Sequence, residues 1–257
     1  MKLCVPLPCF FGQLPFEDAV AKVAALGYRY VEIYDWRRLD LAFAAKALEE
    51  NGVMMLSMCT TEFRLTDPAF RGAWVDGIKE SCKAAAVLGV KKLITQVGPD
   101  TGAPREEQRA SVVEGLGAGA PILERAGVTV MIEPLNTKVN HPGYYLTSSE
   151  EAFDIVRKVG SDNVKVVFDI YHQQVSEGNI IPNVTGNLDL IAHLHAAGHP
   201  GRHELQYGEN DYRNIFAAID RAGYDGACGL EYNPLLAPEE SLRRAMELYG
   251  ATAAPAQ

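Results

Sequence analysis

The chain alternates eight times between a short apolar run of strand length and a longer segment with helical periodicity. This order restricts the fold more than any other feature, because repeated strand–helix units build a parallel sheet. The apolar runs are residues 3–6, 30–34, 53–58, 92–97, 129–133, 164–169, 191–195 and 227–232. Eight units in 257 residues match the number and length of a closed (β/α)8 barrel. We therefore predict a single-domain α/β protein, a TIM barrel over residues 1–250.

The segments between these runs predict the outer helices. They are residues 16–26, 41–51, 68–88, 105–126, 149–159, 184–190, 212–222 and 238–249, and the pattern is weakest in 184–190. A glycine follows six of them, where a left-handed residue commonly ends a helix: Gly27, Gly52, Gly89, Gly127, Gly160 and Gly223. A doubly wound open sheet is the alternative, but no G-x-G-x-x-G follows the first run, which disfavours dinucleotide binding. We expect residues 251–257 to form a frayed tail.

Charge and cysteine usage exclude several classes of protein. The chain has 33 acidic and 24 basic residues, a formal net charge of −9, which disfavours a nucleic-acid binder because phosphate contacts supply most of that affinity. No apolar run approaches the roughly 20 residues of a membrane span, so we expect no membrane partner. The five cysteines are scattered without a C-x-x-C pair, as is typical of reduced thiols in the cytoplasm.

Acidic or imidazole side chains end four consecutive strands of the second half. Glu133, Asp169, His195 and Glu231 are each the last or nearly the last residue of an apolar run. Functional groups of a barrel project from these carboxyl ends, so the four side chains are expected to share one site. Three carboxylates and one imidazole suit a divalent ion such as Mn²⁺, Mg²⁺ or Co²⁺, and the absence of thiolates argues against structural zinc.

Further polar residues follow the same strand ends. His193 shares the face of its strand with His195, and we favour a core position for it over a supporting role beneath the site. His172 follows Asp169 by one turn and can donate a hydrogen bond to a substrate oxygen. Arg202, in a Gly- and Pro-rich loop, can clamp a carboxylate or hydroxyl group. Asn136 belongs to a polar loop that is expected to line the pocket.

The pairing of Glu133 with Glu231 suggests the reaction. The two carboxylates lie three strands apart, so they can reach a bound substrate from different sides. A divalent ion would polarise a carbonyl and its neighbouring hydroxyl group and so lower the cost of an enediolate. Return of the proton to the adjacent carbon gives an aldose–ketose isomerisation, and return to the other face of the same carbon gives an epimerisation. The residues permit both outcomes.

Several motifs together resemble the hydroxypyruvate isomerase family, among the xylose-isomerase-like TIM barrels of sugar isomerases and epimerases. They are IEPLN at 132–136, HPGYYLT at 141–147, FDIYHQQ at 168–174, HLH…GHPGRHE at 193–204, YGENDY at 207–212 and LEYNP at 230–234. The resemblance implies metal ligation by Glu133, Asp169, His195 and Glu231. It also implies that Glu133 and Glu231 are the proton-transfer pair, and that His172 and Arg202 contact the substrate.

The chain departs from that family at two places. Typical hydroxypyruvate isomerases carry Gln where this chain has His195, whereas ketose 3-epimerases carry His there. The family's E-P-G-T-G-E loop is replaced here by residues 204–209, ELQYGE. We therefore expect a metal-dependent isomerase of a small sugar or hydroxy-keto acid, hydroxypyruvate or a related ketose. A ketose 3-epimerase of the D-tagatose or D-fructose type is the alternative, and homo-oligomerisation stays open.

Two other readings are weaker. Apurinic endonucleases share this type of barrel, but they predict a basic face and several zinc ions, which the charge of −9 disfavours. A non-catalytic sugar- or metal-binding barrel predicts binding without turnover, and the intact Glu133 and Glu231 pair gives no reason to prefer it.

Overall fold

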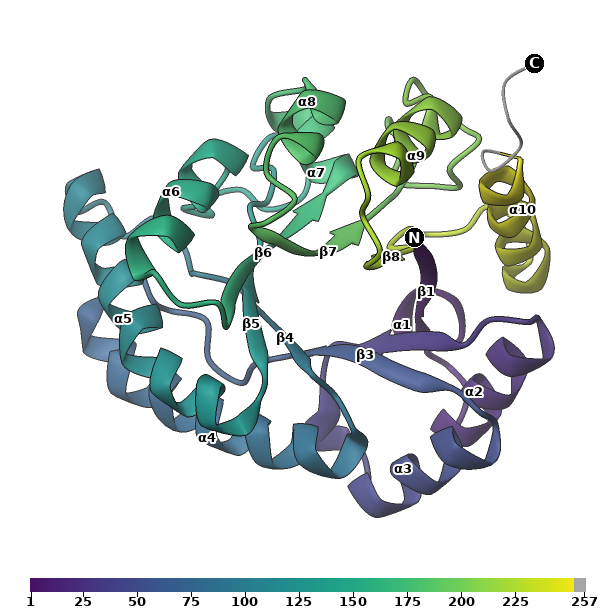
Figure 1. Cartoon of the computed structure of the whole chain (residues 1–257), viewed down its shortest axis with the longest axis horizontal. Coiled ribbons are helices and arrows are strands. Elements are labelled where there is room, and N and C mark those ends of the chain that lie inside the picture. The colour runs from purple at the N-terminus through teal and green to yellow at the C-terminus, as the bar shows by residue number, and fades with distance from the viewer. Residues whose placement is uncertain (252–257) are drawn as a thin grey trace.

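Eight parallel strands form a closed barrel in the order of the sequence (Figure 1). The computed structural model describes residues 1–251. The strands are β1 (Lys2–Pro6), β2 (Tyr30–Ile33), β3 (Met54–Cys59), β4 (Lys92–Thr95), β5 (Thr129–Ile132), β6 (Val164–Asp169), β7 (Ile191–His195) and β8 (Ala227–Gly229). The predicted fold is confirmed, and β1 pairs with β8 to close the barrel.

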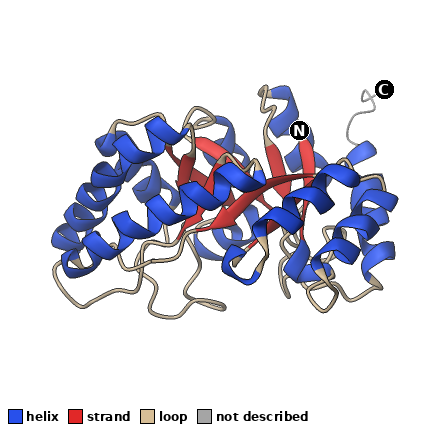
Figure 2. Ribbon diagram, turned by 90° about the horizontal axis from the view of Figure 1, so that it is seen from below, coloured by secondary structure: helices blue, strands red, loops and turns tan. Residues whose placement is uncertain are grey.

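Helices surround the strands, as Figure 2 shows with helices in blue outside the red strands. They are α1 (Leu7–Phe10), α2 (Phe16–Ala25), η1 (Trp36–Arg38), α3 (Leu41–Glu50), η2 (Pro68–Phe70), α4 (Arg71–Leu88), α5 (Arg105–Ala126), α6 (Ser149–Val159), α7 (Ile170–Ser176), α8 (Ile180–Thr185), α9 (Tyr212–Arg221) and α10 (Pro238–Gly250). All six glycines that the sequence places at helix ends have positive φ. None of the helices in residues 1–251 is long and apolar enough to cross a membrane.

The structure differs from the sequence-based elements mainly around the sixth and seventh strands. The weak helix predicted at 184–190 is wrong: α8 lies earlier and ends at Thr185, with Gly186 as its cap. The short helix α7 was missed because it begins directly at the end of β6, where the Asp169 side chain accepts hydrogen bonds from the backbone N–H groups of Tyr171 and His172. Of the tail predicted to fray, residues 252–257 lie outside the described residues.

Alternate residues of each strand point into the barrel and form layers. Ile94, Met131 and Val167 make a small apolar cluster inside it. The residues two positions further along β5 and β6 are Glu133 and Asp169, so the next layer up is polar. The register pairs Asp169 with His195 on β7, and His195 with Gly229 on β8. Strand register therefore sets the level at which these side chains meet.

Helices α4 and α5 pack closely because α5 carries glycines where α4 presents a large ring. A Cβ atom on Gly119 would lie 2.5 Å from the Trp74 ring, whereas a Cβ on Gly117 would meet nothing within 4 Å. Trp74 is 1% exposed, and its indole N–H donates to the Thr95 hydroxyl oxygen at 3.1 Å. Gly119 thus lets the second layer of the fold close over β4.

Replacing these two glycines by alanine should change stability in opposite directions. Gly119→Ala should lower the free energy of unfolding by about 1–3 kcal/mol, because the new methyl group overpacks a core that has no room for it. Gly117→Ala, on the exposed side of the same helix, should raise it by roughly 0.5–1 kcal/mol through helix propensity. Urea denaturation measures both, and a stabilised Gly119→Ala protein would contradict the packing described here.

Candidate active site

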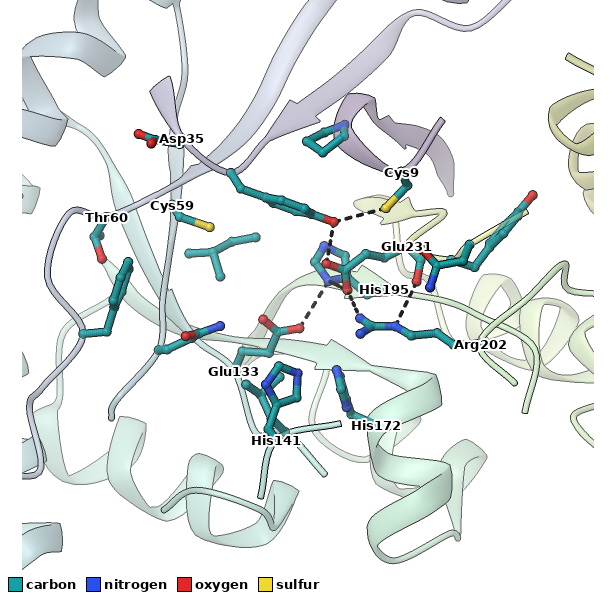
Figure 3. A pocket seen from close by; sticks show the side chains of 18 of the residues that line it. Cys9, Asp35, Cys59, Thr60, Glu133, His141, His172, His195, Arg202 and Glu231 are labelled. Atoms are coloured by element: carbon teal, nitrogen blue, oxygen red, sulfur yellow. Dashed lines mark hydrogen bonds and ion pairs between the residues drawn. The ribbon is translucent and has the colours of Figure 1, made fainter. Parts of the chain in front are cut away.

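A cavity of about 510 Å³ opens at the carboxyl ends of the strands (Figure 3). Its polar lining includes Glu133, His172, His195, Arg202 and Glu231. Apolar side chains also line it: Pro8, Cys9, Cys59, Phe63, Ile94, Leu135 and Tyr232. The cavity is large enough for a small ligand. Asp35 and Arg37 also line it, and Figure 3 shows Asp35 apart from Glu133, Arg202 and Glu231.

The four side chains that end the strands meet at the floor of this cavity. His195 Nδ1 lies 3.2 Å from Glu133 Oε1 and 3.2 Å from Glu231 Oε2. Arg202 Nη2 lies 2.6 Å from Glu231 Oε2 and 3.7 Å from Asp169 Oδ2. The structure therefore brings together all four residues for which the sequence predicts metal ligation.

One oxygen of Asp169 has a structural role, and the other has only distant neighbours, His172 Nε2 at 3.5 Å and Arg202 Nη2 at 3.7 Å. Oδ1 accepts hydrogen bonds from the backbone N–H groups of Tyr171 and His172, at 2.7 and 3.2 Å. Oδ2 is buried and accepts no hydrogen bond from the described residues. A buried carboxylate oxygen is costly to leave unsatisfied, so its position among other acidic groups points to a ligand that is a cation.

The protein compensates only part of the negative charge of the site. Burial raises the pKa of Asp169 to about 6, although Arg202 opposes this shift. Burial also raises the pKa of Glu133, against the effect of His195. For Glu231, the nearby His195 and Arg202 outweigh burial and hold the pKa well below its usual range. Too few positive charges therefore surround Asp169 and Glu133 to stabilise both as carboxylates. Such carboxylates, with one imidazole beside them, are suitable ligands for a hard or borderline divalent ion.

A second imidazole approaches the carboxylates, but its hydrogen bonds give it a different role. One ligand atom each of Glu133, Asp169, His172 and Glu231 lie within 4.8 Å of one another. His172 Nδ1 faces the backbone N–H of Asn136 at 3.2 Å, and a backbone N–H can only donate. Burial lowers the pKa of His172 to about 3, so the ring is neutral and carries its proton on Nε2. That nitrogen is a donor rather than a metal ligand.

Asn136, predicted to line the pocket, is buried behind His172. Its Oδ1 accepts from the backbone N–H groups of Val139 and Asn140, and its Nδ2 donates to Asn140 Oδ1. Nδ2 also lies 2.6 Å from His172 Nδ1. The side chain amide is thus used to shape the loop and to orient His172, and direct contact with a substrate stays a prediction.

Arg202 is held in an uncommon backbone conformation. Its φ of +57° lies in the left-handed region that residues other than glycine seldom occupy. From there the guanidinium reaches Glu231 and packs over the Tyr171 ring, 5.3 Å from its centroid. Backbone strain of this kind is frequent where a side chain must be placed for function.

Tyr34 is a site residue that the sequence analysis did not name. Its hydroxyl group donates to Glu231 Oε1 at 2.8 Å and lies 3.2 Å from Cys9 Sγ (Figure 3). Burial and the adjacent Glu231 raise the pKa of Tyr34 well above its usual value, so it stays a donor. The signal was available, because Tyr34 closes the second apolar run as Glu133 closes the fifth.

Comparison with known proteins agrees with this architecture. The family described as "Xylose isomerase-like TIM barrel" matches residues 20–251. The hydroxypyruvate isomerase of Escherichia coli K12 is 31% identical, over 95% of this chain and 97% of the relative. The 2-oxo-tetronate isomerase of Cupriavidus necator is 32% identical, over 89% of this chain and 91% of that protein.

A solved structure described as an AP endonuclease, family 2, from Brucella melitensis superposes with a TM-score of 0.90. It is 26% identical, and the match covers 94% of this chain and 97% of that one. The chain belongs to the xylose isomerase-like TIM-barrel family, and it is an enzyme of the isomerase and epimerase type.

Proposed function

We propose that this protein is a divalent-metal-dependent isomerase of a small hydroxy-carbonyl substrate, either hydroxypyruvate or a related short keto acid or ketose. The observation that carries the proposal is the buried acidic cluster of the cavity: one oxygen each of Glu133, Asp169 and Glu231 lie within 4.8 Å of one another, and His195 Nδ1 lies 3.2 Å from Glu133 and from Glu231. The names of the two curated relatives support the same class of substrate.

Four residues would hold the ion: Glu133, Asp169, His195 and Glu231. A bound divalent cation supplies Lewis-acid polarisation of the substrate carbonyl and its neighbouring hydroxyl group. The protein's own contribution is a set of donors and bases on fixed strand ends. His172 Nε2–H, which has no hydrogen-bond acceptor among the described residues, can donate to a substrate oxygen that gains charge.

Proton transfer falls to the two glutamates. One carboxylate removes the proton from the hydroxyl-bearing carbon next to the carbonyl, and a carboxylate then returns it to the former carbonyl carbon. The hydroxyl proton passes to the former carbonyl oxygen, which completes the isomerisation. Tyr34 and Arg202 each hold one oxygen of Glu231, at 2.8 and 2.6 Å, so this carboxylate has a fixed orientation toward the cavity. Such fixed geometry is what efficient proton transfer needs.

A ketose 3-epimerase is the second candidate, and His195 favours it. Ketose 3-epimerases carry histidine at this position, as the resemblance implies, and the same two glutamates can exchange a proton on opposite faces of one carbon. The two candidates differ only in where the proton returns.

A role in DNA repair, suggested by the description of the solved Brucella structure, finds no support in the charge of this chain. The formal net charge is −9, whereas binding to a phosphate backbone requires a basic face.

Proton NMR in D2O tests the proposal directly. The protein reconstituted with Mn²⁺ is incubated with hydroxypyruvate, 2-oxo-tetronate, a tetrulose, D-fructose or D-tagatose, and is removed before detection. We expect hydroxypyruvate or another short substrate to be converted to the isomer in which the carbonyl and hydroxyl groups have exchanged carbons, an aldehyde in the case of hydroxypyruvate, and a chelated sample to be inactive. A new ketose deuterated at C3, with both keto acids untouched, would instead establish the epimerase.

Replacing Glu231 by Gln should reduce kcat by about 10²–10⁴-fold, because the carboxamide cannot accept the substrate proton. The fold should survive, since Gln keeps the size of the side chain and an oxygen for Tyr34. Steady-state kinetics with the best substrate measures the effect, and Glu150→Gln, on the exposed side of α6, is the control. Full activity of Glu231→Gln would remove Glu231 from proton transfer.

Replacing Arg202 by Ala should separate substrate binding from metal binding. We expect KM to rise about 10–100-fold with the loss of a charged hydrogen-bond donor at the cavity. Mn²⁺ affinity should be unchanged or higher, because a neighbouring cation repels the metal ion. Isothermal titration with Mn²⁺ and steady-state kinetics give both values, and an equal loss of both would assign Arg202 a structural role.

A further inference from the structure

A second cluster of polar side chains lies one layer below the cavity, inside the barrel. Its centre is Glu32 on β2, which is 1% exposed. Glu32 Oε2 accepts a hydrogen bond from the Ser57 hydroxyl group at 2.5 Å and lies 3.1 Å from His193 Nε2. The same oxygen lies 3.4 Å from His195 Nε2. A carboxylate buried this deeply at the centre of a barrel requires a role that offsets the cost of desolvation.

The barrel keeps space for this contact at β8, which lies between β7 and β1 in its wall. A Cβ atom on Gly229 of β8 would lie 2.0 Å from Glu32 Oε1 and 2.8 Å from His195 Cδ2. Any other residue at this position would displace one of the two side chains. Glycine therefore leaves room for Glu32 and His195 to approach each other across the barrel.

The two ring nitrogens of His195 face carboxylates on opposite sides. Nδ1 faces Glu133 and Glu231 in the cavity, and Nε2 faces Glu32 in the layer below. An ionised carboxylate only accepts hydrogen bonds, so the contact with Glu32 requires the proton on Nε2. By the same rule Nδ1 also carries a proton while Glu133 and Glu231 alone face it, and a metal ion would have to displace that proton. Nε2 would keep the proton that Glu32 accepts, so the ring would offer its lone pair to the ion at Nδ1, toward the cavity.

We propose that Glu32 is a positioning residue that selects the tautomer of His195 and so makes Nδ1 a metal-binding atom. This inference rests on the metal site of the proposed function and deepens it. Histidines that bind metals commonly donate their other N–H to a carboxylate, which orients the ring and makes its lone pair a stronger donor. Here that carboxylate comes from the opposite half of the barrel.

The partners of Glu32 define its role further. Ser57 and His193 contact the same oxygen and fix the carboxylate from two sides, while only His195 extends from this cluster into the cavity. Ser57 and Glu32 are paired in the register of β2 and β3, so that contact is set by the sheet itself. Removal of Ser57 should therefore perturb Glu32 without breaking its contact with His195.

Metal titration of Glu32→Gln tests the inference, with Ser57→Ala as the matched control. Gln keeps the size of Glu32 but removes the charge, so we expect Mn²⁺ to bind about 10–100-fold more weakly, measured by isothermal titration with the metal alone. Ser57→Ala should lose clearly less affinity. Equal losses in both variants, or wild-type affinity in Glu32→Gln, would overturn the role of Glu32.

The tautomer of His195 in the wild-type protein provides a second test, which does not depend on whether a Glu32 variant folds. Long-range ¹H–¹⁵N spectra of the Mg²⁺-loaded protein with ¹⁵N-labelled histidine should show His195 protonated at Nε2 and unprotonated at Nδ1, with His195→Gln used to assign the signal. Protonation at Nδ1 would overturn the inference.

The number of Mn²⁺ ions bound per chain distinguishes the proposed metal site from the proposed role of Glu32. One Mn²⁺ per wild-type chain with weaker binding in Glu32→Gln supports both of them. Two Mn²⁺ per chain, one of them lost in Glu32→Gln, would make the lower cluster an ion site and overturn the positioning role alone. No binding of Mn²⁺ by the wild-type protein would overturn the metal site and this inference together.

Discussion

The energetic constraint on this structure is the burial of acidic side chains in the barrel mouth with too few positive charges beside them. Asp169 is 1% exposed and Glu133 5% exposed. His195 lies within ion-pair distance of Glu133 and Glu231, and Arg202 lies within that distance of Asp169 and Glu231. Such an arrangement costs stability in the absence of a cation, since desolvation penalises every ionised carboxylate. The position of Arg202, its left-handed backbone and the helix cap at Asp169 are all intelligible as partial compensation for this charge.

That compensation extends below the cavity because the strands alternate. Each side chain at the mouth has a residue two positions earlier in the layer beneath it, so His195 stands above His193 and Tyr34 above Glu32. Glu32 and Tyr34 then act on different sides of the site: one contacts His195 from below, and the other contacts Glu231 from within the cavity. A single short strand, β2, thus supports two of the residues that we propose as metal ligands.

Much of the fold could be predicted because the strand–helix alternation and the glycines at helix ends are local signals. The site residues at the ends of β5 to β7 could be found for the same reason. Glu231 could also be found, because it follows the eighth apolar run closely, although β8 itself ends at Gly229. Glu32 could not be found in this way, because the role of a charged residue within an apolar run becomes visible only when the closed barrel brings β7 and its two histidines near β2. The error at 184–190 has another cause: α8 has six residues and too few turns for a periodic pattern.

The difference between His195 and the glutamine of typical hydroxypyruvate isomerases decides less about the reaction than the sequence suggests. An imidazole with its proton on Nε2 and a carboxamide both offer an acceptor on one side and an N–H donor on the other. Glu32 can hold either group, so both side chains would present an acceptor to the cavity. The outcome then depends on which substrate carbon lies between Glu133 and Glu231. That choice belongs to the cavity walls, and to a loop that Glu204 anchors by accepting from the backbone N–H groups of Leu235 and Leu236.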